Sequence, residues 1–169
     1  MEQVLNKNAY KKLGFNHMET AAIVVPFNKL LNNYQVFYHK MQAFHWNAVG
    51  GDFYDLHEIF EQLYNKSVED IDVLAERIRI FGQKPNTHID EYREEAEIEI
   101  NKTEMSGEFM IKETISDIET LLSFMIEVNN NALTHSDFGS FHVVSGMIHR
   151  LEMQHWQLTA FVNKKYENA

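Results

Sequence analysis

Five side chains in the first half of the chain are of the types that bind divalent metal ions. They are two imidazoles and three carboxylates: His45, His57, Glu61, Asp72 and Glu76. The spacing of four residues within two of the pairs, His57 with Glu61 and Asp72 with Glu76, places each pair on one helix face. Imidazole and carboxylate together suit divalent iron, zinc or manganese. Singly, each residue is also explained as a helix cap, a core residue or part of a solvated face; together they indicate a metal site.

The two pairs cannot reach one ion if they lie on a single straight helix. At about 100° per residue, Glu61 and Asp72 point within about 20° of each other, but a rise of about 1.5 Å per residue separates their backbones by about 16 Å. In a two-fold dimer, this helix can pack antiparallel against its copy. Asp72 and Glu76 of one chain then lie next to His57 and Glu61 of the other. The arrangement predicts two equivalent sites, each shared across the dimer interface.

A competing candidate lies nearer the C-terminus, in His149, Glu152 and His155. Glu152 and His155 form the Glu-x-x-His pattern of helical bundles that hold two irons within one chain. Such a centre needs a second Glu-x-x-His on another helix, and no other histidine has Glu three positions before it. The trio is therefore interpreted as a surface or interface patch.

Helices must position these candidates, because apolar residues recur at steps of three and four almost throughout the chain. Pro26 suits the first turn of the first long helix, and Asp52 can cap the second. A long acidic connection follows, in which residues 89–98 form a short extra helix. The predicted bundle helices cover about 26–48, 53–81, 107–134 and 137–164, after an N-terminal tail over 1–19.

Four long helices with one long link between the second and third predict an all-α, ferritin-like four-helix bundle. The 169 residues suit one domain, and 44% hydrophobic residues suffice for its core. The absence of Cys excludes disulfides, thiolate metal sites and a thiol nucleophile. A net charge of −10 attracts cations and repels nucleic acid and anionic membranes. No targeting or membrane-spanning segment is visible, so the expected location is the cytoplasm.

Three short stretches carry a family resemblance. They are YHKMQAFHWN over residues 38–47, LHE over 56–58 and AER over 75–77. Together they closely resemble the Dps family, the miniferritins, and the likeness extends over nearly the whole chain because the helix lengths and the middle link are similar too. The spacing from His-Trp-Asn to His-Glu is specific to that family.

The resemblance implies a ligand set. It implies that His45, His57 and Glu61 bind iron from one subunit, while Asp72 and Glu76 come from the two-fold neighbour, in agreement with the shared site argued from spacing. Glu61 is a departure, since many members carry Asp at this position. Its longer side chain should still reach the metal.

The activity implied by the resemblance is iron oxidation and storage. Such a protein is a hollow dodecamer that oxidises Fe(II), preferably with hydrogen peroxide, and stores ferric mineral, with zinc as a competitor. Trp46 is similar to the family tryptophan that quenches stray oxidising equivalents; a packing role is the equal alternative. The family's pores are lined by the start of the fourth helix, where Asp137 and His142 are the candidates. Their alternatives are a helix N-cap for Asp137 and an ordinary surface or core role for His142.

DNA binding is a separate question, because DNA-binding members use flexible, lysine-rich tails. The lysines available here are few and interrupted by acids: Lys7, Lys11 and Lys12 near one end, Lys164 and Lys165 near the other. Because these lysines recur in every subunit of a dodecamer, together they add weak avidity for DNA. Against the net charge of −10, DNA binding is expected to be weak or absent. A DNA-compacting, nucleoid-associated protein with a minor iron role remains the alternative, and a plain helical interaction module is the third.

Overall fold

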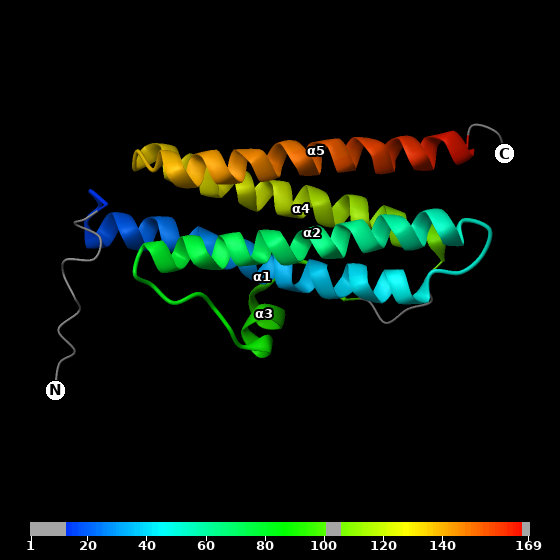
Figure 1. The fold of residues 1–169 in the computed structure, drawn as a ribbon, viewed down its shortest axis with the longest axis horizontal. Helices are drawn as coiled ribbons and strands as arrows, with labels where there is room; N and C mark the ends of the chain where they lie inside the picture. Colours follow the sequence, from blue (N-terminus) through cyan, green and yellow to red (C-terminus); the bar gives the residue numbers. More distant parts are fainter. Residues whose placement is uncertain (1–12, 101–105, 167–169) are drawn as a thin grey trace.

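The computed structural model describes residues 13–100 and 106–166, and within these ranges the chain is helical with no strand. The helices are α1 (His17–Asn47), α2 (Phe53–Ile80), α3 (Ile89–Glu95), α4 (Gly107–Thr134) and α5 (Phe138–Tyr166). Figure 1 shows α1, α2, α4 and α5 lying side by side along the long axis, with α3 in the link beside them. The predicted all-α bundle with a short extra helix is therefore confirmed. None of the helices described is long and apolar enough to cross a membrane.

The core forms from the apolar stripes that the helical periodicity predicts. On α1, Phe27, Leu30 and Phe37 are at most 1% exposed, and Phe60 and Leu74 of α2 are fully buried. Burial of each such side chain contributes roughly 1.5–3 kcal/mol. α1 packs against α2, α4 and α3, and α4 packs against α5. The close pairing of α1 with α2 matters most for function, because these two helices carry all five predicted ligands.

The first helix begins at His17, so the predicted start near Pro26 and the predicted tail over 1–19 are wrong at this boundary. Asn16 is the N-cap: its side-chain oxygen accepts hydrogen bonds from the backbone N–H groups of Met18 and Glu19, at 2.9 and 3.0 Å. The Glu19 carboxylate accepts the Asn16 N–H at 2.7 Å, which completes a capping box. The cap starts the helix early enough to place Pro26 inside it, where the ring is buried.

Two other local predictions need adjustment. The extra helix ends at Glu95, before the predicted 98. The reason is tertiary: the Asn33 side-chain oxygen accepts hydrogen bonds from the backbone N–H groups of Glu97 and Ile98, at 2.9 and 3.1 Å, which holds this segment outside the helix. Asp52 occupies the N-cap position of α2, but its side chain makes no capping hydrogen bond.

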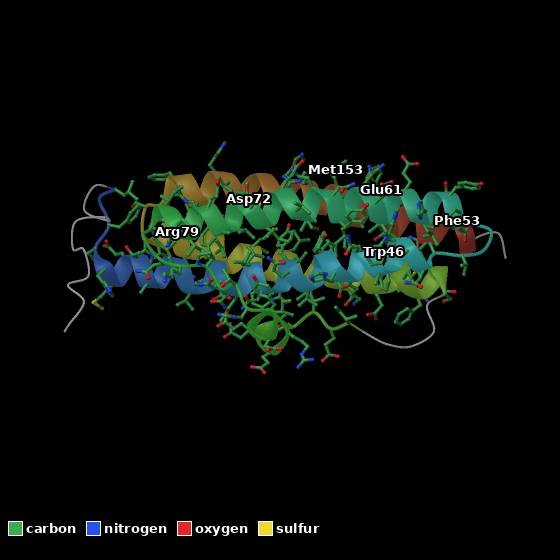
Figure 2. All side chains as sticks on the ribbon, turned by 60° about the horizontal axis from the view of Figure 1, so that its bottom comes forward. Trp46, Phe53, Glu61, Asp72, Arg79 and Met153 are labelled. Carbon is green, nitrogen blue, oxygen red and sulfur yellow. The ribbon has the colours of Figure 1, made fainter. Side chains whose placement is uncertain are left out.

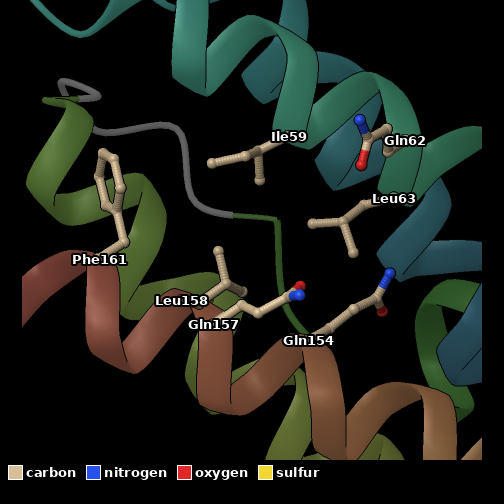
Figure 3. Close-up of a pocket in the computed structure, with 7 residues that line it drawn as sticks. All are labelled: Ile59, Gln62, Leu63, Gln154, Gln157, Leu158 and Phe161. Carbon is tan, nitrogen blue, oxygen red and sulfur yellow. The ribbon is translucent and has the colours of Figure 1, made fainter.

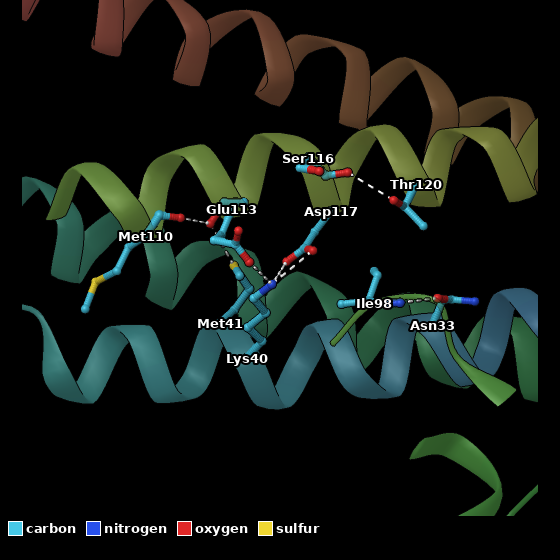
Figure 4. Close-up of polar contacts among 10 residues, drawn as sticks. Asn33, Lys40, Met41, Ile98, Met110, Glu113, Ser116, Asp117 and Thr120 are labelled. Carbon is cyan, nitrogen blue, oxygen red and sulfur yellow. Dashed lines mark hydrogen bonds and ion pairs between the residues drawn. The ribbon is translucent and has the colours of Figure 1, made fainter. Parts of the chain in front are cut away.

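A lysine is buried inside the bundle, between α1 and α4. Lys40 is 2% exposed. Its Nζ lies 2.9 Å from the Glu113 carboxylate and 2.8 and 3.1 Å from the two Asp117 oxygens (Figure 4). Burial raises the pKa of Asp117 to about 6, because the loss of hydration outweighs the opposite influence of Lys40. A buried charge is stable only with such partners, so this cluster cross-links the two helices.

The Asp117 carboxyl makes the folded state less stable as the pH rises through its titration range. Its pKa rises from an ordinary 3.8 to about 6 on folding, so between these values the folded state holds a proton that the unfolded state lacks. The resulting loss of folding stability, at most about 3 kcal/mol, develops as the pH rises between these two pKa values and persists at higher pH. Urea unfolding at fixed protein concentration should therefore show Asp117→Asn gaining stability relative to wild type as the pH rises. A constant difference across the window contradicts this assignment.

Candidate metal centre

Two of the predicted ligands, His45 and His57, meet where α1 ends and α2 begins. Their rings are stacked, with centroids 3.7 Å apart and planes inclined by 21°. His45 lies in the last turn of α1, and His57 lies near the start of α2. Gly50, with φ at 99°, provides the left-handed backbone at which the chain reverses between the helices. The turn thus brings together two residues twelve positions apart.

Backbone hydrogen bonds determine which nitrogen of each ring is free. His45 Nδ1 lies 2.8 Å from the carbonyl oxygen of His57, and His57 Nδ1 lies 3.0 Å from the carbonyl oxygen of His45. Because a carbonyl oxygen can only accept, each Nδ1 carries a proton and donates it, so that in the neutral ring Nε2 keeps the lone pair. Hydrogen bonds of this kind orient metal-binding imidazoles and raise their basicity. The pair therefore offers two preformed nitrogen ligands.

Aromatic neighbours hold both imidazole rings in place. The Phe53 ring stacks on His57, with centroids 5.0 Å apart, and the Tyr64 ring meets His45 edge-to-face at 5.3 Å. His45 is 8% exposed, whereas His57 is partly exposed. The imidazole pair is thus packed against aromatic rings on one side, and His57 stays partly open to solvent.

Glu61 lies one turn beyond His57 on α2, with its side chain exposed. Tyr64 follows it by three residues and is only partly exposed. Burial, and after it the negative charge and hydrogen bonding of Glu61, raise the pKa of the Tyr64 hydroxyl. Figure 2 shows Glu61 toward the same end of the bundle as Phe53 and Trp46. One carboxylate is therefore positioned near the imidazole pair.

The other two predicted ligands lie elsewhere on α2. Asp72 and Glu76 are both exposed, and Figure 2 shows Asp72 displaced along the helix from Glu61 toward Arg79. In the part of the chain that the structure describes, no three His, Asp or Glu side chains converge closely enough to hold a metal ion. One subunit thus brings two imidazoles together and leaves the Asp72 pair apart, and completion of the site by a second subunit stays a prediction.

Trp46 is 69% exposed on the single subunit. It is therefore not part of its own subunit's core, although it directly follows the buried His45. Its predicted role in quenching oxidising equivalents stays a prediction, and its exposure shows no packing role within this subunit.

The residues of the competing candidate do not converge on a metal. His149 and Glu152 are exposed on α5. His155 instead places Nε2 2.9 Å from the Glu119 carboxylate of α4. These positions agree with the interpretation of the trio as a surface patch.

Of the alternatives for Asp137, the structure shows the helix N-cap. Its carboxylate is 2% exposed, accepts the backbone N–H of Ser140 at 3.1 Å and pairs with Arg77 Nη2 at 2.6 Å. Gly139 makes room for this pair, since a Cβ there would lie 2.7 Å from Arg77 Nη2. His142 is exposed, as its surface alternative requires. The carboxylate of Asp137 thus connects α2 to the start of α5.

Replacing this cap should destabilise the protein. Asp137→Ala removes a capping acceptor and leaves Arg77 without its carboxylate, at a combined cost of about 2–4 kcal/mol, since the Arg77 guanidinium is only partly hydrated. Asp137→Asn keeps a capping oxygen and should lose less. Thermal unfolding at fixed protein concentration measures both. If both variants unfold like wild type but take up iron more slowly, Asp137 belongs to the entry path instead.

An apolar groove of about 140 Å³ lies between α2 and α5 (Figure 3). Its lining residues are uncharged: Ile59, Gln62, Leu63, Gln154, Gln157, Leu158 and Phe161. With no imidazole or carboxylate, the groove offers a metal ion no suitable ligand. The candidate site is therefore the imidazole pair, where α1 ends and α2 begins.

The sequence reasoning missed two contributors to the site. The reciprocal bonds between each imidazole and the other residue's carbonyl carry no sequence signal, because any residue supplies a carbonyl. Tyr64 did have a signal: it lies seven positions after His57 and three after Glu61, which places it on the same helix face.

Comparison with known proteins identifies relatives of the chain. Residues 27–165 match the family model of the ferritin-like domain. A Bacillus anthracis protein named DNA protection during starvation protein 2 is 32% identical over 142 residues, which cover 84% of this chain and 97% of that protein.

Solved structures are similar as well. The Dps protein from Vibrio cholerae O1, described as a member of a broad superfamily of ferritin-like diiron-carboxylate proteins, superposes with a TM-score of 0.86 at 29% identity, covering 89% of this chain and 94% of that one. A Dps protein from Bacillus brevis gives a TM-score of 0.84 at 29% identity, covering 88% of this chain and 99% of that one.

Proposed function

Because the chain belongs to the Dps family of ferritin-like proteins, we propose that it is a ferroxidase that stores iron. It oxidises Fe(II) with hydrogen peroxide and keeps the ferric product as mineral inside a hollow dodecamer. The observation that carries the proposal is the stacked pair of His45 and His57, whose Nε2 atoms are both left free by backbone hydrogen bonds. Neutral imidazole nitrogen is a good ligand for ferrous iron, the substrate.

The complete site in this proposal is shared between two subunits. One subunit supplies His45, His57 and Glu61, and the partner subunit supplies Asp72 and Glu76. Two features support this division: all three carboxylates are exposed on α2, and the described part of one chain holds no three-ligand cluster. The carboxylates also offset the positive charge of iron, which increases on oxidation.

A pair of ferrous ions supplies both electrons that peroxide takes up. Each Fe(II) loses one electron, the O–O bond breaks, and both oxygens leave as hydroxide: 2 Fe²⁺ + H₂O₂ → 2 Fe³⁺ + 2 OH⁻. No hydroxyl radical forms, and both reagents that generate it are consumed, which protects against oxidative damage. Zinc, which takes the same ligands, competes for the site. Trp46, next to His45, is a candidate for reducing oxidising equivalents that escape.

In this proposal the protein acts in the cytoplasm and protects by its chemistry. It binds DNA weakly or not at all. The net charge of −10 favours cation uptake and opposes binding to phosphate. The alternative, a DNA-compacting and nucleoid-associated protein, is favoured by the name of the Bacillus anthracis relative, DNA protection during starvation protein 2. The lysines that would serve it, Lys7, Lys11, Lys12, Lys164 and Lys165, have side chains outside the described part of the structure.

An anaerobic Fe(II) titration tests the proposal. We expect saturable binding of at most a pair of iron ions per chain, followed by rapid oxidation of all bound iron when peroxide is added. The double variant His45→Ala/His57→Ala should bind little iron and oxidise it slowly, because both nitrogen ligands are gone. Wild-type protein that neither binds Fe(II) saturably nor speeds its oxidation by peroxide contradicts the proposed function.

A further inference from the structure

A tyrosine lies directly against the candidate metal centre. The Tyr64 ring meets the His45 ring edge-to-face, with centroids 5.3 Å apart and planes at 72°. On α2, Tyr64 is also the close neighbour of Glu61, whose charge and hydrogen bonding act on its hydroxyl. Tyr64 therefore contacts two of the proposed iron ligands of its own subunit, from α1 and from α2.

A second tyrosine continues from the first. The Tyr38 ring on α1 meets Tyr64 edge-to-face, with centroids 6.3 Å apart and planes at 76°. Its hydroxyl accepts a hydrogen bond from Gln42 Nε2 at 3.1 Å. The Tyr38 ring in turn lies 5.0 Å from the ring of His39, an exposed residue. Two oxidisable phenols in contact thus lead from the metal centre toward the surface.

These contacts point to a role when a site holds a single iron. A single Fe(II) gives peroxide one electron instead of two, and one-electron reduction of peroxide releases a hydroxyl radical. From this geometry we infer that Tyr64 donates the missing electron, with Tyr38 as the next donor. The inference rests on the proposed iron-oxidising function and adds a redox-active residue to it.

The step balances with hydrogen peroxide as the oxidant. Fe(II) and the Tyr64 phenol each lose one electron, and the O–O bond breaks. The phenol proton joins one peroxide oxygen to form water, and the other oxygen leaves as hydroxide: Fe²⁺ + H₂O₂ + TyrOH → Fe³⁺ + TyrO• + H₂O + OH⁻. Tyr38 then reduces the Tyr64 radical by transfer of an electron and a proton, and itself becomes the radical.

Exposure separates Tyr64 from the other aromatic candidates. Trp46 is 69% exposed and Tyr54 is 84% exposed, although both lie near the centre in sequence. Tyr64 is partly covered and touches the ring of a ligand. Electron transfer is fastest through such direct contact, so Tyr64 competes best with escape of the radical.

Freeze-quench electron paramagnetic resonance on the assembled protein tests this role. The protein is loaded with fewer Fe(II) ions than chains, mixed with peroxide and frozen, in parallel with spin trapping of hydroxyl radical. Wild type should give a tyrosyl signal that narrows when the protein contains ring-deuterated tyrosine. Tyr64→Phe should lose that first signal and release more trapped hydroxyl radical, while Tyr54→Phe, the matched control, should behave like wild type.

Each outcome bears on a separate claim. With a full iron load, Tyr64→Phe should still oxidise two Fe(II) for each peroxide consumed, because paired irons supply both electrons without a phenol. Tyr38→Phe should prolong the Tyr64 signal; an unchanged lifetime removes Tyr38 from the route. A radical that stays tyrosyl in Tyr64→Phe, or that disappears only in Trp46→Phe, overturns the inference even if iron oxidation is normal. Absence of iron oxidation in wild type overturns the proposed function instead.

Discussion

A mixture of His57→Ala chains with Asp72→Ala chains should oxidise Fe(II) although neither variant does so alone. In a shared site, the imidazoles and Glu61 come from one subunit and the Asp72 pair from the other. In a mixed two-fold dimer, one site therefore carries both defects and the other carries none. With random pairing of equal amounts, roughly one quarter of all sites are intact, so oxidation should recover to about that fraction of the wild-type rate.

The matched control is a mixture of His45→Ala with His57→Ala. These two residues are stacked within one chain, so every site in a mixed dimer of this kind lacks one imidazole. Subunit exchange must be shown in both mixtures, for example by mass spectrometry of tagged chains. If the first mixture recovers no activity despite exchange, or if the control mixture recovers as much, the site is not divided between subunits in the proposed way.

Wild-type protein should shield plasmid DNA from iron and peroxide at near-physiological salt without retarding it on a gel. Phosphate contacts need clustered Lys or Arg, whereas this chain has 15 basic residues against 25 acidic ones. Removal of iron needs only the ligands and an oxidant. His45→Ala/His57→Ala should therefore lose most of the shielding, measured as surviving supercoiled plasmid, while it keeps the wild-type assembly size.

Deletion of residues 1–12 separates chemical shielding from coating of the DNA. The deletion removes Lys7, Lys11 and Lys12 and leaves all five proposed ligands, so shielding should change little provided that the assembly persists. Full shielding by the double-histidine variant would show that iron chemistry is not the cause. Clear gel retardation that disappears with residues 1–12 would favour the DNA-compacting alternative.

The helical architecture was predictable from the sequence because its signals are local. Apolar residues at steps of three and four define a buried stripe whatever the rest of the chain does, and the long link between two helices indicates the ferritin-like bundle. The candidate ligands were also found from spacing, since residues four apart share a helix face. The boundary that was misplaced furthest, at His17, had a local signal as well, in the capping box of Asn16 and Glu19.

Only the tertiary structure decided how the chemical groups are used. The free Nε2 atoms of His45 and His57 result from carbonyl oxygens that another helix brings within hydrogen-bond distance. The burial of Lys40 results from α4 placing Glu113 and Asp117 around it. Such contacts join residues far apart in the sequence. The neighbours of a lysine or histidine along the chain therefore do not show whether its side chain is buried or exposed. The burial and the partners of these side chains follow from packing, which the order of residues along one helix does not reveal.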